Sequence, residues 1–188
     1  MEHESDAPAR RAPDFVPRRQ LLSADLVARA VRRMAHEVIE RVEDPANVVV
    51  VGLQTGGVPV SRVLADDLVA IAGHPFDVGT LDVAFYRDDL HRRPLAASAV
   101  TDIPVDLSDR VVLLVDDVLF TGRTVRAALN ALSDWGRPRA VQLAVLVDRG
   151  HRELPIRPDY VGKNLPTSRG EAIVATPEGV WIGERGVR

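Results

Sequence analysis

The chain has 188 residues, 46% of them hydrophobic, and a net charge of −3, which suits one soluble domain with a buried core. The charge argues against bulk nucleic-acid affinity without excluding a local basic face. The absence of cysteine excludes disulfides, a thiolate nucleophile and a thiolate metal site, and with no membrane-length apolar run or signal peptide we expect a cytoplasmic protein.

Residues 1–20 are polar, interrupted by proline and without periodicity, so we expect a mobile tail. Ser23 is a candidate N-cap, and helical spacing of apolar residues from Leu26 to Val42 predicts an amphipathic helix. Its polar face carries basic residues among glutamates: Arg29, Arg32, Arg33, His36 and Arg41. Taken alone, such a face is usually solvated and laced with i, i+4 ion pairs.

The apolar run from Val48 to Leu53 predicts a buried strand, and a helix is expected from about Val60 to Ala72. The glycine pair between them, Gly56 and Gly57, would let the backbone approach an anionic group closely. Strand-to-helix turns also use glycine for geometry alone. Combined with the phosphate turn described below, the pair predicts a ligand with phosphate at both ends.

Residues 76–85 are a strand candidate, and the following segment to residue 110 shows no sustained period. Irregular segments of this length usually form a functional lid, a hairpin arm or disorder. A lid bearing Arg87, Arg92 and Arg93 would close over a pyrophosphate and exclude water, which makes Arg87 a candidate catalytic residue. A charged arm used for subunit contact explains the segment equally well.

The most informative stretch runs from Val111 to Thr124. Its first five residues are aliphatic and predict a central, buried parallel strand that ends in Asp116 and Asp117, where open α/β sheets place their ligands. The small-residue turn from Thr121 into a helix offers unpaired amides and a positive helix end to a phosphate. Amides beside two acids predict a phosphorylated sugar, held by its phosphate and its hydroxyls.

The rest of the chain alternates strands and helices. Apolar spacing from Val125 to Trp135 predicts a helix stopped by Gly136, the next strand covers residues 140–147, and its carboxyl end leads into a polar loop on the ligand edge. A short strand at residues 160–162 and a terminal hairpin over residues 171–175 and 180–183 follow. The pattern predicts an α/β fold, a mostly parallel sheet flanked by helices.

The run from Val112 to Thr124 resembles the phosphoribosyl-pyrophosphate signature of type I phosphoribosyltransferases. Residues 85–90, 142–157 and 159–168 narrow the resemblance to the PyrR family, bifunctional bacterial regulators of pyrimidine operons that have uracil phosphoribosyltransferase activity. The match covers about residues 32–173. It implies the type I phosphoribosyltransferase fold.

The resemblance implies one domain over residues 21–188, with a flexible lid arm at about 84–110 and a small hood at about 150–188. The implied reaction converts uracil and phosphoribosyl pyrophosphate, with Mg²⁺, to UMP and pyrophosphate. Asp116, Asp117 and Arg87 would be catalytic, and no all-protein metal cage is expected. The implied substrate-binding residues are Thr55, Gly56, Asp116, Asp117, Val118, Leu119, Phe120, Thr121, Gly122, Arg123, Thr124, Arg149 and Ile173.

Within that set, the two acids would hold the ribose hydroxyls and residues 119–124 would wrap the 5′-phosphate. Arg149 would lie near the base or pyrophosphate, and Ile173 would contact the uracil plane. Phe120 stands where some purine-specific relatives place an aspartate as general base, which favours uracil because its N1–H is acidic enough to need no strong base. Gly56 stands where relatives carry arginine, so a phosphate clamp is missing and turnover is expected to be weak.

RNA binding is also implied by the resemblance, since the family reads a stem-loop in pyrimidine messenger RNA and responds to uridine nucleotides such as UMP. The corresponding basic residues are Arg33, His36, Arg41, His151, Arg152 and Lys163. A homodimer or higher homo-oligomer would enlarge this patch, and phosphate contacts would make binding sensitive to salt. Two alternatives remain open: a nucleobase phosphoribosyltransferase without RNA regulation, and an RNA-binding regulator with little catalysis.

Overall fold

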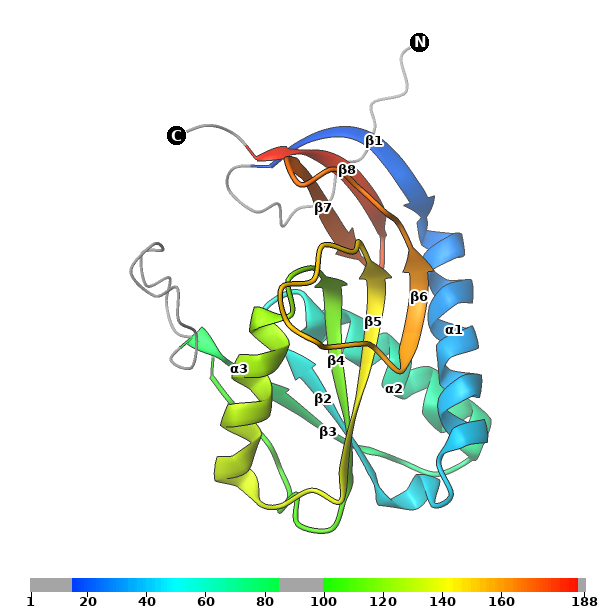
Figure 1. Ribbon diagram of the computed structural model, residues 1–188. Helices are drawn as coiled ribbons and strands as arrows, with labels where there is room; N and C mark the ends of the chain where they lie inside the picture. The colour runs from blue at the N-terminus through cyan, green and yellow to red at the C-terminus, as the bar shows by residue number, and fades with distance from the viewer. Residues whose placement is uncertain (1–14, 85–99, 186–188) are drawn as a thin grey trace.

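A parallel sheet forms the body of the molecule in the computed structural model, which describes residues 15–84 and 100–185 (Figure 1). Its five strands lie in the order β3-β2-β4-β5-β6, with every pairing parallel, as predicted. The carboxyl ends of the strands therefore meet at one edge. The strands are β2 (Val48–Leu53), β3 (Asp77–Leu81), β4 (Val111–Leu119), β5 (Ala140–Asp148) and β6 (Tyr160–Asn164).

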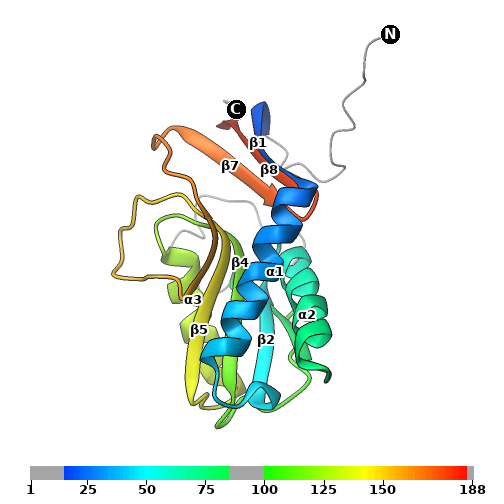
Figure 2. The same ribbon diagram turned by 90° about the vertical axis from the view of Figure 1, so that its right-hand side faces the viewer.

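Helices cover both faces of this sheet (Figure 2). Helices α1 (Ala24–Arg41) and α2 (Gly57–Ala72) pack on one face and α3 (Arg123–Leu132) on the other. Successive residues of a strand point to opposite faces, so Val50 belongs to the core under α1 and α2 while Val51 belongs to the core under α3. Covering both faces explains why β2 and β4 read as continuous apolar runs.

A small antiparallel sheet, the hood, lies beyond the carboxyl ends of the main strands (Figure 1). It consists of β1 (Phe15–Ser23), β8 (Gly179–Arg185) and β7 (Glu171–Thr176), in that order. Residues 15–20 therefore belong to a sheet and not to the expected mobile tail, which is a correction. Strand β1 pairs with β8 at the other end of the chain, and a pairing so distant leaves no local periodicity.

The last part of the expected lid arm, residues 100–110, packs against the domain with the five-stranded sheet. Residues 85–99, with Arg87, Arg92 and Arg93, lie outside the described residues. The arm was expected to continue to residue 110, but Ile103 and Leu107 are buried in the core under α3. Backbone hydrogen bonds of 2.7 and 2.9 Å also join Asp102 to Thr80 of β3. Two buried positions are too few to give a periodic signal, which is why the boundary was misplaced.

Two further helix boundaries differ from the prediction. Helix α2 begins at Gly57, three residues before the expected start, and α3 ends at Leu132, where a 3₁₀ turn (Ser133–Trp135) takes over; a second 3₁₀ turn (Pro45–Asn47) follows α1. Gly136 has a φ of 129° and a ψ of −171°, so it is not the left-handed helix cap that was expected. No helix among the described residues is long and apolar enough to cross a membrane.

Candidate functional site

Asp116 and Asp117 lie near the end of β4, at the carboxyl edge of the sheet. Asp116 is 8% exposed and accepts the Asp117 amide at 3.0 Å, while the Asp117 carboxylate accepts the Val118 amide at 2.8 Å. Burial raises the pKa of Asp117, and hydrogen bonds from Asp116 and Val118 lower it by less. A carboxylate in this setting gains from a nearby cation or from hydroxyl donors.

The turn after β4 leads directly into α3. Gly122 has a φ of 90°, a left-handed conformation that glycine adopts without strain, and its carbonyl accepts the Arg126 amide at 3.0 Å. The Thr121 hydroxyl accepts the Arg123 amide at 3.4 Å. We call residues 119–122 the phosphate turn, because a helix start presents amide donors that lack helical acceptors.

The loop after β5, residues 149–156, forms hydrogen bonds with one side of the phosphate turn, and we call it the clasp loop. Its donors reach the carbonyl oxygens of three consecutive turn residues. These are Leu119 (from the Arg149 amide, 3.1 Å), Phe120 (from Arg152 Nη1, 2.9 Å) and Thr121 (from the Glu153 and Leu154 amides, 3.0 and 3.2 Å). The Glu153 carboxylate also accepts Arg123 Nε at 2.9 Å.

These hydrogen bonds fix the direction of the carbonyl and N–H groups of the phosphate turn. In a trans peptide, the N–H of one residue points opposite to the carbonyl of the residue before it. The carbonyls of residues 119–121 point to the clasp loop, so the N–H groups of residues 120–122 point away from it. The turn therefore offers a row of donors on its open side, which is the chemistry that the sequence predicted for a phosphate.

The loop between β2 and α2, residues 54–57, lies against the two acids. The Gln54 amide donates to the Leu81 carbonyl at 2.9 Å. A Cβ on Gly57 would lie 2.3 Å from the Val115 carbonyl oxygen, and a Cβ on Gly56 would lie 2.1 Å from Asp117 Oδ2. Gly57 is therefore required for close approach to the β4 backbone, whereas a side chain at position 56 would displace the Asp117 carboxylate. Gly56 leaves out the expected arginine, but it also makes room for the Asp117 carboxylate.

Arg149 is 6% exposed, and its guanidinium carbon lies 4.1 Å from the centre of the Phe120 ring. It donates hydrogen bonds to residues in and before β7, so it links the phosphate turn to the hood. Ile173 of β7 packs against the same core cluster as Val118. The sequence did not single out Thr167 or Glu153, whose contacts with Arg149 and Arg123 depend on loops that meet only in the folded chain.

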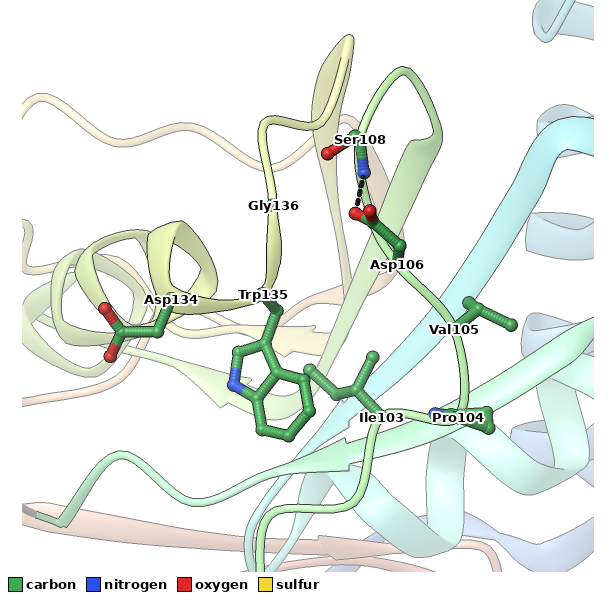
Figure 3. Close-up of a pocket in the computed structure, with 8 residues that line it drawn as sticks. All are labelled: Ile103, Pro104, Val105, Asp106, Ser108, Asp134, Trp135 and Gly136. Carbon is green, nitrogen blue, oxygen red and sulfur yellow. Dashed lines mark hydrogen bonds between the residues drawn. The ribbon is translucent and has the colours of Figure 1, made fainter.

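Figure 3 shows a pocket of about 460 Å³ whose lining residues come before β4 and β5 in the chain, so it lies at the amino end of the sheet. It is lined by residues that precede β4 and β5: Ile103, Pro104, Val105, Asp106, Ser108, Asp134, Trp135 and Gly136. Hydrogen bonds from Ser108 lower the pKa of Asp106. None of the predicted site residues lies in this pocket.

Comparison with known proteins identifies the family. A model of the phosphoribosyl transferase domain matches residues 17–177. A curated relative from Streptomyces coelicolor named Bifunctional protein PyrR is 58% identical over 156 residues, covering 82% of this chain and 81% of the relative. A protein of the same name from Bacillus subtilis is 52% identical over 159 residues, covering 82% and 87%. The chain belongs to the PyrR family.

Solved structures confirm the fold of this PyrR-family chain as that of the type I phosphoribosyltransferases. A hypoxanthine phosphoribosyltransferase from Staphylococcus aureus matches with a TM-score of 0.67 at 18% identity, covering 90% of this chain and 93% of that one. The corresponding enzyme from Trypanosoma cruzi matches with a TM-score of 0.68 at 16% identity, covering 90% and 98%.

The residues that the PyrR resemblance assigns to RNA fall into separate groups. Arg33 donates to the carbonyls of Val161 and Gly162 at 2.9 and 2.7 Å, and Arg41 donates to that of Asp159 at 2.9 Å. These carbonyls lie on or beside the edge strand β6, so both arginines also satisfy an otherwise open strand edge. His36 instead lies near Asp67 of α2. Burial raises the pKa of Asp67, the Arg32 charge lowers it by less, and His36 makes a smaller contribution in the lowering direction.

His151 and Arg152 lie in the clasp loop beside the phosphate turn. The His151 ring meets the edge of the Phe120 ring with centroids 5.8 Å apart, and Arg152 forms an ion pair with Asp148. Exposed Lys163 pairs in the sheet with Val147 of β5, so it lies between the clasp loop and the α1 side of β6. Arg33, Arg41 and Lys163 therefore lie on or beside β6, His151 and Arg152 lie in the clasp loop, and His36 lies near α2.

Proposed function

We propose that this PyrR-family chain regulates pyrimidine biosynthetic genes by binding their messenger RNA in response to UMP, and also makes UMP and pyrophosphate from uracil and phosphoribosyl pyrophosphate. The observation that carries the proposal is the end of β4, where two acids lie beside a turn whose first three carbonyls, those of residues 119–121, face the clasp loop. The name of the relatives, Bifunctional protein PyrR, supports the pairing of the two activities.

In the proposed reaction, the bond between the ribose C1 and pyrophosphate breaks with its electron pair leaving on pyrophosphate, and uracil N1 bonds to C1 and releases its proton to pyrophosphate or to water. Asp116 and Asp117 would accept hydrogen bonds from the ribose hydroxyls, while the amides of residues 120–122 would hold the 5′-phosphate. Positive charge develops on the ribose carbon, and the nearby carboxylates favour it. No covalent enzyme intermediate is needed.

The acids at the end of β4 fit magnesium entering with phosphoribosyl pyrophosphate. Mg²⁺ prefers oxygen ligands and commonly binds through one or two carboxylates plus substrate phosphates. Asp116 and Asp117 supply such carboxylates, and among the described residues no group of three or more histidine, aspartate or glutamate side chains forms a metal site. When bound, the ion would neutralise charge on the departing pyrophosphate.

Uracil is the proposed base because the phosphate turn carries the aromatic residue Phe120 where some purine-specific relatives place an aspartate. The Arg149 guanidinium stacks on the Phe120 ring, and the His151 ring contacts the same ring in a T-shaped arrangement. Ile173 of the hood would cover the uracil plane. A flat apolar surface suits a pyrimidine whose own N1–H is acidic.

For the regulatory half, UMP would occupy the same cradle as the substrate, and RNA phosphates would meet the basic residues around β6. We also propose that the protein works in the cytoplasm as a homodimer or larger homo-oligomer, since a second copy would double a basic surface that is small on a chain of net charge −3.

Two assays test the proposal. Pyrophosphate release from phosphoribosyl pyrophosphate should require uracil, and filter binding to the leader RNA of a pyrimidine operon should tighten with UMP. Uracil-dependent release of pyrophosphate without RNA binding would indicate a nucleobase phosphoribosyltransferase that has no role in RNA regulation. UMP-dependent RNA binding without release would leave a regulator with little catalysis, which the missing arginine at Gly56 would explain.

A further inference from the structure

We propose that Arg149 is a positioning residue that fixes the hood above the phosphate turn, and that it thereby sets the affinity for uracil independently of phosphoribosyl pyrophosphate. This inference rests on the proposed function. It differs from the sequence-based expectation, in which Arg149 itself lies against the base or the pyrophosphate.

The first support is the set of contacts that Arg149 makes. Its Nε donates to the Thr167 hydroxyl at 3.0 Å, and its Nη2 donates to the Ser168 and Glu171 carbonyls at 3.0 and 2.8 Å. All three acceptors lie at the entry to the hood. On its other side the guanidinium stacks on Phe120 of the phosphate turn. The Arg149 side chain therefore links the phosphate turn to the segment that leads into β7 of the hood.

The second support is the geometry of an arginine at this place. A guanidinium is planar, so it can stack on a ring with its face while its edge donates to several carbonyls. A lysine ammonium has no flat face and donates from a single point. Burying a cation to 6% exposure is costly unless hydrogen bonds compensate, and the hood carbonyls supply them.

The third support is the position of Ile173 relative to these bonds. The Glu171 carbonyl that Arg149 holds begins β7, and Ile173 lies two residues further along the strand. Strand residues are spaced by about 3.3 Å, so Ile173 follows any shift of Glu171 almost rigidly. Strand β7 in turn contacts β4, where Val118 follows the two acids. Arg149 thus sets how far Ile173, the proposed cover of the uracil plane, lies from the phosphate turn.

The fourth support is that other groups hold the carbonyls of the phosphate turn, while the Arg149 guanidinium stacks on the Phe120 ring. Backbone amides of Glu153 and Leu154 and the side chain of Arg152 hold its carbonyls, and the Arg149 amide persists in any variant at that position. Removing the guanidinium should therefore release the hood and leave the phosphate cradle in place. The effect should fall on the uracil side of the reaction.

The test compares Arg149→Met and Arg149→Lys with the control Arg169→Met, which changes an exposed arginine of the same connection. Steady-state assays with uracil and phosphoribosyl pyrophosphate give both Michaelis constants. We expect the constant for uracil to rise by about tenfold in Arg149→Met, which corresponds to about 1.4 kcal/mol, with that for phosphoribosyl pyrophosphate within about twofold. Arg149→Lys should fall between, and Arg169→Met should match wild type.

Hydrogen exchange provides a readout that needs no activity. Amides of β7 should exchange faster in Arg149→Met, while those of α1 and of the phosphate turn should not change. Equal rises in both Michaelis constants, or a rise for phosphoribosyl pyrophosphate alone, would overturn the inference in favour of direct substrate contact. If wild type shows no uracil-dependent turnover, the proposed function fails. Unchanged β7 exchange in Arg149→Met would then refute the positioning role separately.

Discussion

Gly56→Ala tests whether the loop after β2 has to leave room for the Asp117 carboxylate. Gly56 has a φ of −74° and a ψ of −33°, which alanine adopts freely, so the substitution adds only a Cβ. That Cβ would lie 2.1 Å from Asp117 Oδ2 and 2.8 Å from Oδ1, so the carboxylate has to rotate away. The rotation would break its hydrogen bond from the Val118 amide, now 2.8 Å long.

The size of the effect follows from that bond. A hydrogen bond to a charged group contributes about 1.5–3 kcal/mol, which is about 10- to 150-fold in an equilibrium or rate constant. We therefore expect kcat/KM for phosphoribosyl pyrophosphate, measured at saturating uracil, to fall by about that factor in Gly56→Ala. The matched control is Gly170→Ala, because a Cβ on Gly170 meets nothing within 4 Å.

An arginine at position 56 would meet the same Asp117 carboxylate. Gly56→Arg would restore a phosphate clamp but would also displace the Asp117 carboxylate, so it should recover at most part of the activity that Gly56→Ala loses. If Gly56→Ala keeps kcat/KM within about twofold of wild type, the claim that this glycine makes room for Asp117 is wrong.

Further predictions concern the acids and the basic residues. Because burial raises the pKa of Asp117, the folded chain binds more protons than the unfolded chain between the ordinary and the raised value, and stability falls as the pH rises through that window. Asp117→Asn should therefore raise the Tm at pH 7 but not at pH 3, and a lower Tm at pH 7 would contradict the idea that burying this charge destabilises the fold. The same variant should show no UMP binding by calorimetry. Lys163→Ala should weaken RNA binding without changing the Tm, whereas Arg33→Ala should lower both because Arg33 also bonds the edge of β6; equal Tm values for the two variants would argue against that structural role. Phe15→Ala, which changes a side chain that is 9% exposed, should lower the Tm through loss of hood packing, by a free energy of about 3 kcal/mol or less, and an unchanged Tm would show that β1 does not stabilise the hood.

The sequence predicted the body of this fold well because its signals are local. The run from Val111 to Leu119 carries its own strand pattern, its acids and its turn, and β2 was predicted with its observed bounds. The hood was harder to predict. Strand β1 has a proline and three consecutive exposed residues, Arg18 to Gln20, so it lacks the alternation of a half-buried strand, and its pairing with β8 makes it a strand.

The site shows the same division. Asp116, Asp117 and the helix start at Gly122 were recognisable from residue type and order, whereas the clasp loop was not. Its contacts join residues about 30 positions apart, such as Arg152 and Phe120, through backbone carbonyls that have no sequence signature. From the sequence, Gly56 indicates only the loss of a phosphate-binding arginine, because the sequence does not show that the Asp117 carboxylate lies beside it.

The central claim is that one cradle at the end of β4 binds substrate and senses UMP. Filter binding of a pyrimidine-operon leader RNA, with and without UMP, measures this most directly in wild type and in the double variant Asp116→Asn, Asp117→Asn. We expect UMP to tighten RNA binding in wild type and to have no effect in the double variant, with equal binding in the absence of UMP. Tightening by UMP in both proteins would show that the nucleotide is sensed elsewhere.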